Sequence, residues 1–185
     1  ESNNQSVKLD LGGYAKGYAL DRAVDLLRKQ GVANALINIG GNIIAMGQHG
    51  KRPWQVGIQH PRKSGALATM DLHDGEAIGT SGDYQRYFMV GNVRYCHLID
   101  PGSGYPVHGV QAVTILTRGP QAGVMSDVAS KPLFISGTKG WRAMADAVEL
   151  QDAMLVDAQG KVHITASMNK RLKFTDKHLR PKVKG

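Results

Sequence analysis

Residues 84–99, YQRYFMVGNVRYCHLI, carry the clearest sign of how this chain folds. Two runs rich in aromatic and β-branched residues flank Gly91-Asn92, a two-residue loop typical of a primed hairpin turn. Such a turn joins antiparallel strands directly, whereas parallel strands need a long crossover connection. The stretch therefore predicts antiparallel pairing, and it argues against a chain built only from βαβ units.

Periodicity extends this interpretation in both directions. Apolar residues follow helical spacing from Ala15 to Gln30, with Gly31 as a stop, and further helices are expected at 121–136 and 141–149. Within the second of these, Pro132 fits only near a helix start or at a kink. Strands are expected at 7–11, 35–39, 43–47, 54–59, 67–72 and 110–117, with a hairpin at 153–165. The fold class is α+β: a mixed, largely antiparallel sheet with packed helices.

Composition fits one globular domain. The chain has 185 residues, 42% hydrophobic and 21% charged, and no apolar run of the ~20 residues that a membrane span needs. The net charge of +8 is concentrated in residues 168–185, with seven Lys or Arg against one Asp; residues 1–167 hold sixteen basic and fourteen acidic residues. We therefore expect a domain at 1–167 and a basic C-terminal tail at 168–185. The tail is interpreted as a solvated end, with a membrane surface or an acidic partner as alternatives, and not as a nucleic-acid interface.

Glycine-rich joints supply the first two candidate sites. In LDLGGYAKGYALDR (9–22), paired glycines before a helix offer free N–H groups that suit phosphate, and Lys16 adds positive charge; a tight structural turn is equally consistent. In INIGGNI (37–43), two glycines after a strand allow close approach by a ligand, or by a neighbouring backbone.

Three further stretches carry polar side chains. AIGTSGDYQRYF (77–88) gathers Thr80, Ser81 and Asp83 around glycines, which is more typical of a turn than of a site. His97 precedes a Gly-rich loop able to close over a ligand, although a strand histidine is more often structural. In SDVASKPLF (126–134), Asp127 and Lys131 share a helix face, as an ion pair or as half of a site. The single Cys96 excludes an internal disulfide and a Cys-rich zinc site.

In this order, the motifs DLGGYAKGY, INIGGNI, TSGDYQRYF, HLIDPGSGYPV and SDVASKPLFISG resemble the FAD:protein FMN transferase family, often called ApbE. The resemblance runs from about Val7 to Gly137 and implies the ApbE-like flavin transferase fold. It implies that FAD is cleaved with help from a divalent metal, usually Mg²⁺. FMN then passes to a Thr or Ser hydroxyl of an acceptor flavoprotein, and AMP leaves; some members instead hydrolyse FAD. Phosphoryl transfer of this kind depends mainly on positioning and charge neutralisation.

The resemblance also implies roles for individual residues. Asp127 would be a metal-binding carboxylate and catalytic residue, and His97 would help to remove the proton of the acceptor hydroxyl. The backbone carbonyl of Gly13 would be a second metal ligand. The residues expected to bind the flavin nucleotide are Asp10, Lys16, Asn38, Gly40, Gly41 and Ile99.

One position departs from the family pattern. The family's metal helix reads Asp-x-x-x-Thr, and here the fifth position is Lys131, whose ammonium group donates three hydrogen bonds and accepts none. Lys131 would weaken metal binding, unless a shift of the helix lets Ser130 replace the threonine. Alternatively Lys131 would take the place of the metal as a catalytic group and neutralise the pyrophosphate directly.

A second departure concerns the beginning of the chain. ESNNQSVKLDL has neither the basic start nor the apolar stretch of a signal peptide, and it opens almost on a strand, so we expect a processed or truncated product. The family carries an upstream segment with further FAD contacts, which a missing N-terminal part, a partner chain or a homodimer would supply. Family members also suggest an extracytoplasmic location, in the periplasm or at the membrane. The leading interpretation is FMN transfer; the alternative is a non-catalytic FAD-binding protein.

Overall fold

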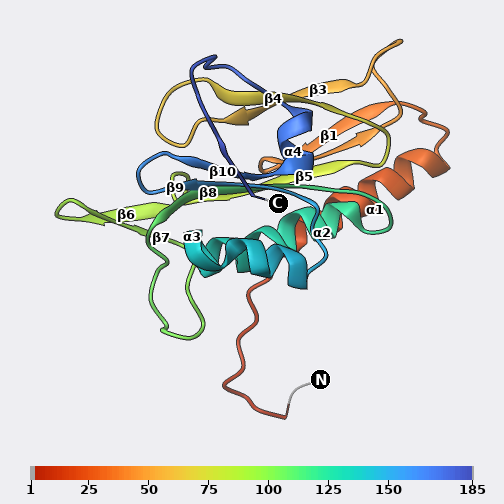
Figure 1. The fold of residues 1–185 in the computed structure, drawn as a ribbon. Coiled ribbons are helices and arrows are strands. Elements are labelled where there is room, and N and C mark those ends of the chain that lie inside the picture. The colour runs from red at the N-terminus through yellow and green to blue at the C-terminus, as the bar shows by residue number, and fades with distance from the viewer. Residues whose placement is uncertain (1–2, 185) are drawn as a thin grey trace.

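A seven-stranded sheet runs through the centre of the molecule in the computed structural model, which describes residues 3–184 (Figure 1). In spatial order its strands are β1 (Ala35–Ile39), β2 (Asn42–Met46), β5 (Ala77–Gly82), β8 (Val110–Thr117), β9 (Asp152–Asp157), β10 (Val162–Thr165) and β12 (Lys182–Lys184). All neighbours are antiparallel except β10 and β12. The predicted α+β class with a mixed, largely antiparallel sheet is confirmed.

Three helices cover one face of this sheet: α1 (Ala15–Lys29), α2 (Ala122–Val128) and α3 (Ser130–Ala147) (Figure 1). Leu20 of α1 packs in one apolar cluster with Ile44 and Met46, and Phe134 and Trp141 of α3 belong to another. No helix among residues 3–184 combines the length and the apolar character needed to cross a bilayer.

A smaller sheet and α4 (Ala166–Arg171) cover the opposite face (Figure 1). This sheet has the order β11 (Leu172–Phe174), β4 (Ala66–Leu72) and β3 (Trp54–Gln59). β3 alternates buried and exposed side chains, because only one of its faces meets the core. β8, in contrast, is buried along all eight residues, because it lies between the two layers.

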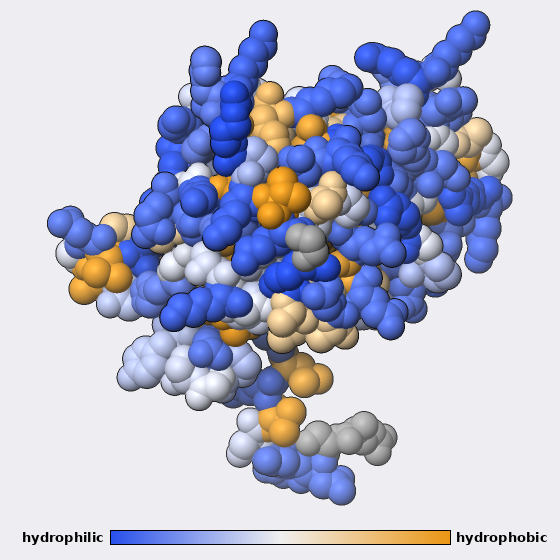
Figure 2. All heavy atoms as spheres, in the orientation of Figure 1, coloured by the Kyte–Doolittle hydropathy of each residue, from blue (hydrophilic) through white to orange (hydrophobic). Residues whose placement is uncertain are grey.

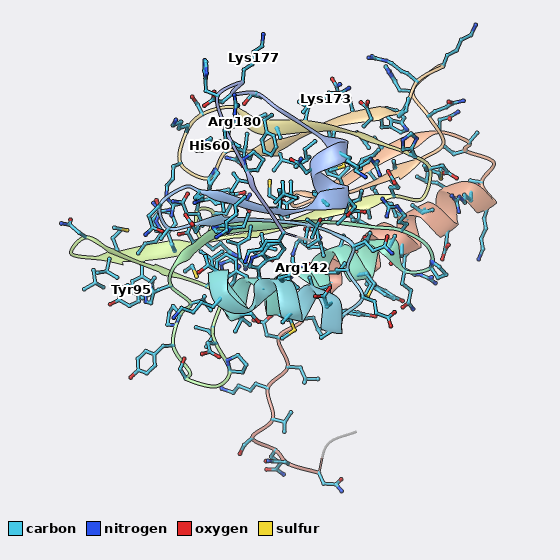
Figure 3. The ribbon with its side chains drawn as sticks, viewed as in Figure 1. His60, Tyr95, Arg142, Lys173, Lys177 and Arg180 are labelled. Atoms are coloured by element: carbon cyan, nitrogen blue, oxygen red, sulfur yellow. The ribbon has the colours of Figure 1, made fainter. Side chains whose placement is uncertain are left out.

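The basic C-terminal stretch corrects one expectation. Met168 and Leu172 are buried, β11 pairs with β4, and β12 pairs with β10, so this stretch is not merely a solvated end. These two apolar residues lie among basic residues in the sequence. The expectation of a solvated end rested on the net charge alone and did not take them into account. The expected boundary after residue 167 falls within α4. The basic residues Lys173, Lys177 and Arg180 project outward around this layer in Figure 3.

Two more expectations were wrong in detail. Residues 7–11 form no strand, because no neighbouring strand pairs with them; Leu9 is 86% exposed. The stretch 77–82, interpreted as a polar turn, is instead the strand β5 between β2 and β8. Its small side chains are required by tertiary contact: a Cβ on Gly79 would lie 2.1 Å from the carbonyl oxygen of Ser126.

The expected helix at 121–136 is divided into α2 and the start of α3. Pro132 lacks the N–H that would continue the helical hydrogen-bond ladder, and it lies in the first turn of α3, as predicted. Ala129 between the helices keeps a helical φ of −75° and ψ of −15°, so the residues on either side keep helical spacing. α3 then absorbs much of the third expected helix across a kink at Gly137, whose φ is 62°.

The opening hairpin is shorter than predicted. β6 (Tyr87–Val90) pairs with β7 (Val93–Cys96), and the hairpin projects beyond the main sheet (Figure 1). Gly91 alone in its turn has a positive φ, 56°, which is the pattern of a type II′ turn. Its exposed apolar side chains form an orange tip in Figure 2. The base of this hairpin carries Arg86 and His97, which line the cavity described next.

Candidate active site

A cavity of about 270 Å³ lies where α1, β5, the base of the hairpin and the α2–α3 junction meet. It is lined by Gly12, Lys16, Gly40, Thr80, Ser81, Gly82, Gln85, Arg86, His97, Asp127 and Lys131. All five sequence motifs therefore contribute to one place. The lining has three basic side chains, of Lys16, Arg86 and Lys131, against a single carboxylate, so an anion is the ligand that its charge favours.

Close packing of α1 on α2 carries Lys16 to this cavity. A Cβ on Gly17 would lie 2.3 Å from the carbonyl oxygen of Gly123, so only glycine permits the observed approach. The Asp21 carboxylate on α1 accepts hydrogen bonds from the backbone N–H groups of Gly123 (2.8 Å) and Val124 (2.9 Å). These N–H groups lie at the start of α2 and have no helical partner. Asp21 therefore caps α2 and fixes the two helices together.

Asp127 is the buried centre of the cavity, with a side chain that is 2% exposed. Its Oδ1 accepts hydrogen bonds from Nζ of Lys16 (3.0 Å) and Nζ of Lys131 (2.8 Å), and its Oδ2 accepts one from the N–H of Gly17 (3.2 Å). Burial alone would raise the pKa of Asp127. The hydrogen bonds and charges of Lys131 and then Lys16 outweigh burial and hold the pKa below its usual value. The carboxylate is therefore ionised at neutral pH.

Lys131 is held in one position by its neighbours. Its Nζ also donates to the backbone carbonyl of Asp127, one turn earlier. Its side-chain stem lies against Gly13, where a Cβ would come within 2.7 Å of the Lys131 Cε. Burial lowers the pKa of Lys131, the carboxylate of Asp127 opposes this, and the nearby charges of Lys16 and Arg86 lower it further. A bound anion would relieve this crowding of positive charge.

The glycine motif of residues 37–43 lies beside Lys16. Gly40 and Gly41 form the β1–β2 turn, with φ values of 57° and 91°. The Oδ1 of Asn38 accepts a hydrogen bond from the N–H of Gly41 (3.0 Å), which stabilises that turn. A Cβ on Gly40 would lie 3.0 Å from Cδ of Lys16, so glycine also leaves room for the lysine stem. The motif is therefore a tight turn that also lines a cavity, and the group that approaches Gly40 is the Lys16 side chain.

A second cavity of about 210 Å³ adjoins the first and shares Gly40, Thr80 and Gln85 with it. Its remaining lining residues are Asn38, Gly41, Ile43, Gly57, Ile58, Gln59, Ile78 and Tyr84. This cavity has no charged side chain in its lining. The two cavities together offer a cationic compartment beside a neutral one.

His97 has the hydrogen bonding of a proton acceptor. Its Nδ1 lies 3.2 Å from the carbonyl oxygen of Arg86, and a carbonyl oxygen only accepts hydrogen bonds. Nδ1 therefore carries the proton in the neutral ring, and Nε2 keeps its lone pair. Burial, the charge of Arg86 and the more distant charges of Lys131 and Lys16 lower the pKa of His97, against the opposing effect of its bond to the Arg86 carbonyl. The ring is consequently neutral at pH 7.

The polar side chains of β5 and its flank divide into two groups. Thr80 and Ser81 line the cavity, and Oγ of Ser81 lies 2.7 Å from Oγ of Ser130. Ser130 donates a hydrogen bond to the backbone carbonyl of Asp127 (3.0 Å), so its hydroxyl group lies between β5 and the end of α2. Asp83 is structural: its carboxylate binds the guanidinium of Arg62 through both oxygens, at 2.7 and 2.6 Å.

The structure brings together some of the predicted site residues and leaves others apart. Lys16, Gly40, His97, Asp127 and Lys131 line the cavity. Asn38 and Gly41 line the adjoining one, and Gly13 lies against the Lys131 stem. Asp10 and Ile99 belong to neither lining. The roles assigned to all these residues stay predictions.

Asp10 and Ile99 instead stabilise local turns. Asp10 is exposed and accepts a hydrogen bond from the N–H of Gly12 (2.7 Å). Ile99 is 48% exposed and forms an isolated bridge with Pro106 at the base of the following loop. Arg86 is the charged residue of the cavity lining that sequence reasoning missed. It lies inside the quoted motif TSGDYQRYF, and its only signal was a basic residue directly before an apolar strand.

The oxygen atoms around Asp127 do not fit a divalent metal ion. Three of them already accept hydrogen bonds from the ammonium groups of Lys16 and Lys131. They are the backbone carbonyl oxygens of Gly12 and Asp127, and Oδ1 of Asp127. Among residues 3–184 no group of three or more His, Cys, Asp or Glu side chains could hold a metal. The expected ligation by Gly13 and Asp127 stays a prediction, and no step below depends on it.

The chain matches known proteins over most of its length. A family model described as "ApbE family" matches residues 1–155. A curated FAD:protein FMN transferase of Rhodobacter capsulatus is 38% identical over 175 residues, which is 95% of this chain and 33% of that protein. One from Klebsiella pneumoniae is 35% identical over 172 residues, covering 91% of this chain and 51% of that protein. The chain thus spans about a third to a half of the length of these relatives.

Solved structures give the same match. The ApbE protein of Thermotoga maritima superposes with a TM-score of 0.81 at 34% identity, covering 90% of this chain and 54% of that one. The flavinyl transferase ApbE of Pseudomonas stutzeri, in its apo form, gives a TM-score of 0.74 at 32% identity, covering 89% and 51%. The likeness therefore extends to the overall arrangement of helices and strands.

Proposed function

Because the chain belongs to the ApbE family, we propose that it works as a FAD:protein FMN transferase, with the cavity around Asp127 as its active site. The reaction cleaves the pyrophosphate of FAD, attaches FMN to a Thr or Ser hydroxyl of an acceptor flavoprotein, and releases AMP. One observation carries the proposal: three basic side chains and a neutral histidine line the same cavity as a single buried carboxylate.

Charge supports placing the pyrophosphate in this cavity. Lys16, Arg86 and Lys131 exceed the one negative charge of Asp127, so the lining is left with a net positive charge. Negative charge on the phosphate oxygens and on the departing AMP would be neutralised there by groups already in position. Gln85 and Thr80 add neutral hydrogen-bonding groups at the wall shared with the second cavity.

His97 suits the proton transfer. The acceptor oxygen attacks the phosphorus of the FMN half, the bond from that phosphorus to the bridging oxygen breaks, and AMP leaves with this oxygen. The proton of the attacking hydroxyl passes to Nε2 of His97. This nitrogen is unprotonated in the neutral ring, because Nδ1 carries the proton that is donated to the Arg86 carbonyl. Since the lowered pKa keeps the ring neutral at pH 7, the base is ready without prior deprotonation.

The adjoining neutral cavity suits a ring system of the dinucleotide. Ile43, Ile58 and Tyr84 provide apolar and aromatic surface next to the cationic compartment. FAD carries aromatic rings on either side of its pyrophosphate, so one ring would occupy this cavity while the pyrophosphate lies near Lys16. Contacts to the other ring would come from an upstream segment, a partner chain or a second copy, as expected for the family.

A non-catalytic FAD-binding protein is the second candidate, and Lys131 favours it, since it stands at the position of the family's metal-binding threonine. Incubation with FAD and a Thr-containing acceptor separates the two candidates. AMP together with covalent FMN on the acceptor supports transfer. Stable bound FAD without AMP supports binding alone. An extracytoplasmic location is proposed on the family likeness, and the location of a tagged full-length protein in fractionated cells tests it.

A further inference from the structure

The ammonium groups of Lys16 and Lys131 bind oxygen atoms around Asp127, among them one oxygen of the carboxylate that was expected to bind a metal. Lys16 donates to the carbonyl of Gly12 (3.2 Å) and to Oδ1 of Asp127 (3.0 Å). Lys131 donates to the same Oδ1 (2.8 Å) and to the carbonyl of Asp127. Backbone carbonyl and carboxylate oxygens are the ligands of hard cations, and here ammonium hydrogens take their lone pairs.

We infer that the ammonium group of Lys131 replaces a divalent cation in this cavity, and that the chain binds a nucleotide diphosphate without Mg²⁺. That the diphosphate belongs to FAD rests on the proposed function. The substitution is chemically reasonable because both groups place positive charge beside Asp127, where it faces the bound anion. An ammonium group additionally donates hydrogen bonds to phosphate oxygens.

Lys131 is held as a fixed part of the site rather than a free surface side chain. Its stem fills the space beside Gly13 that any Cβ would occupy, and two of its three N–H bonds are directed at Asp127. The third N–H is left for a ligand in the cavity. Lys16 likewise donates two hydrogen bonds, to the carbonyl of Gly12 and to Asp127, and has one N–H left for a ligand.

A divalent ion entering the site would have to displace this arrangement. An ion bound at Oδ1 of Asp127 would take the hydrogen bond that Lys131 makes there, and Lys131 would lie beside a double positive charge. Lys16 would meet the same repulsion. Because neither lysine has another carboxylate in the cavity lining, no alternative ion pair within it would compensate.

Titration calorimetry with inorganic pyrophosphate tests the inference on the full chain, with EDTA in one arm and excess Mg²⁺ in the other. We expect the wild type to bind pyrophosphate in EDTA, and to show no heat when titrated with Mg²⁺ alone. Lys131→Thr should weaken binding in EDTA at least tenfold and should gain a response to Mg²⁺. Lys139→Thr is the matched control, since it removes an exposed lysine from the same helix and should bind like the wild type.

Wild-type binding of pyrophosphate only with Mg²⁺, or tight binding of Mg²⁺ alone, would overturn the inference. So would Lys131→Thr binding unchanged in EDTA. If Lys131→Thr does not fold, Lys131→Gln replaces it, and the wild-type arms decide the question by themselves. A parallel assay with FAD and an acceptor separates this inference from the proposed function. Pyrophosphate binding in EDTA without FMN transfer would remove the function alone, whereas transfer with strictly Mg²⁺-dependent binding would remove the inference alone.

Discussion

Asp127 positions two of the three cationic side chains of the cavity. It holds Lys16 from α1 and Lys131 from α3 at one oxygen atom, and its other oxygen binds the backbone of Gly17. Without this negative charge, two ammonium groups would face each other in a half-buried space. Its contribution to function is therefore the placement of positive charge for a bound phosphate.

Replacing Asp127 with asparagine tests this placement. The amide keeps the size of the side chain but removes the charge that holds both lysines, and displacement of catalytic groups by about 1 Å typically costs roughly 100-fold in rate. We therefore expect AMP release from FAD to fall by about that factor in Asp127→Asn. Asp25→Asn, on the exposed surface of α1, is the control and should leave the rate unchanged. Equal rates for the two variants would remove Asp127 from the mechanism.

The pH dependence of transfer should report His97. A base must be unprotonated, and the pKa of this ring lies below the usual value of about 6.5. The rate should therefore be independent of pH near neutrality and should fall only below about pH 6.5, as the ring gains its proton. His97→Gln should lower the rate by about 10²–10⁴-fold and abolish this acid limb, and the exposed His178→Gln should do neither. An unchanged acid limb in His97→Gln would assign it to another group.

At the scale of elements, contact between α1 and α2 decides whether the site forms. Gly17 and Gly123 let the helix backbones approach, and Asp21 caps α2 from the side. Lys16 directly precedes Gly17 on α1, and Asp127 lies one helical turn after Gly123 on α2. The distance between the helices therefore sets the distance between the charged groups.

Gly17→Ala should change stability and ligand binding together. The new Cβ would lie 2.3 Å from the Gly123 carbonyl oxygen, and overpacking of this kind typically costs about 1–3 kcal/mol in the free energy of unfolding. Displacement of α1 should also raise the KM for FAD severalfold. Urea unfolding and steady-state kinetics measure the two effects. In Gly57→Ala the new Cβ would meet its nearest neighbour at an ordinary 3.5 Å, so the free energy of unfolding should stay near that of the wild type. Equal stability of the two variants would contradict the packing argument.

The elements with local signals could be predicted from the sequence. The helical spacing of 15–30 and the Gly91-Asn92 turn both lie within one short stretch, so the structure agrees with them closely. The expected strand at 7–11 had the right alternation but no neighbour to pair with. β5 was missed because its small residues are required by α2, whose Ser126 carbonyl approaches Gly79.

In the site too, contacts within one helical stretch could be predicted from the sequence, and contacts between distant segments could not. Contact between Asp127 and Lys131 was predictable, because positions four apart share a helix face and the α2–α3 junction stays helical. The arrival of Lys16 at the same oxygen atom depends on helix packing between residues 111 positions apart. The place of Lys131 against Gly13 likewise depends on tertiary contact, which no spacing rule supplies.

At the scale of the whole molecule, a charge cluster ties the C-terminal segment to the sheets. Glu76 is buried and its carboxylate binds Arg171 of α4 at 2.9 and 2.7 Å, while Arg118 approaches it at 3.2 Å. Arg118 also pairs with Asp152 of β9 at 2.8 Å. The basic stretch therefore contributes to the stability of the fold through specific contacts as well as through Met168 and Leu172.

Arg171→Leu should destabilise the protein because it leaves the Glu76 carboxylate partly unpaired. We expect a loss of about 2 kcal/mol in urea unfolding, below the full cost of breaking a buried pair because Arg118 remains. Lys170→Leu, at an exposed position of the same helix, is the control and should lie within about 0.5 kcal/mol of the wild type. A loss equal to that of the control would mean that the pair contributes nothing.

The Glu76–Arg171 pair also determines how the stability of the protein changes with pH. Burial would raise the pKa of Glu76, but the hydrogen bond from Arg171, the backbone N–H of His73, the charge of Arg171 and the hydrogen bond from Arg118 together lower it. Its contribution to stability is therefore present above the unfolded pKa of about 4.3 and is lost as pH falls through the lower folded pKa. Arg171→Leu should consequently differ less from the wild type in acid than at pH 7.

The most direct test of the whole account is the fate of FAD incubated with the full chain and a Thr-containing acceptor flavoprotein, followed by mass spectrometry of the acceptor and chromatography of the nucleotides. The account predicts FMN linked to the acceptor hydroxyl and one AMP released for each FMN transferred, with both products strongly reduced in Asp127→Asn. FAD that stays bound and intact, with no AMP and an unmodified acceptor, would contradict it.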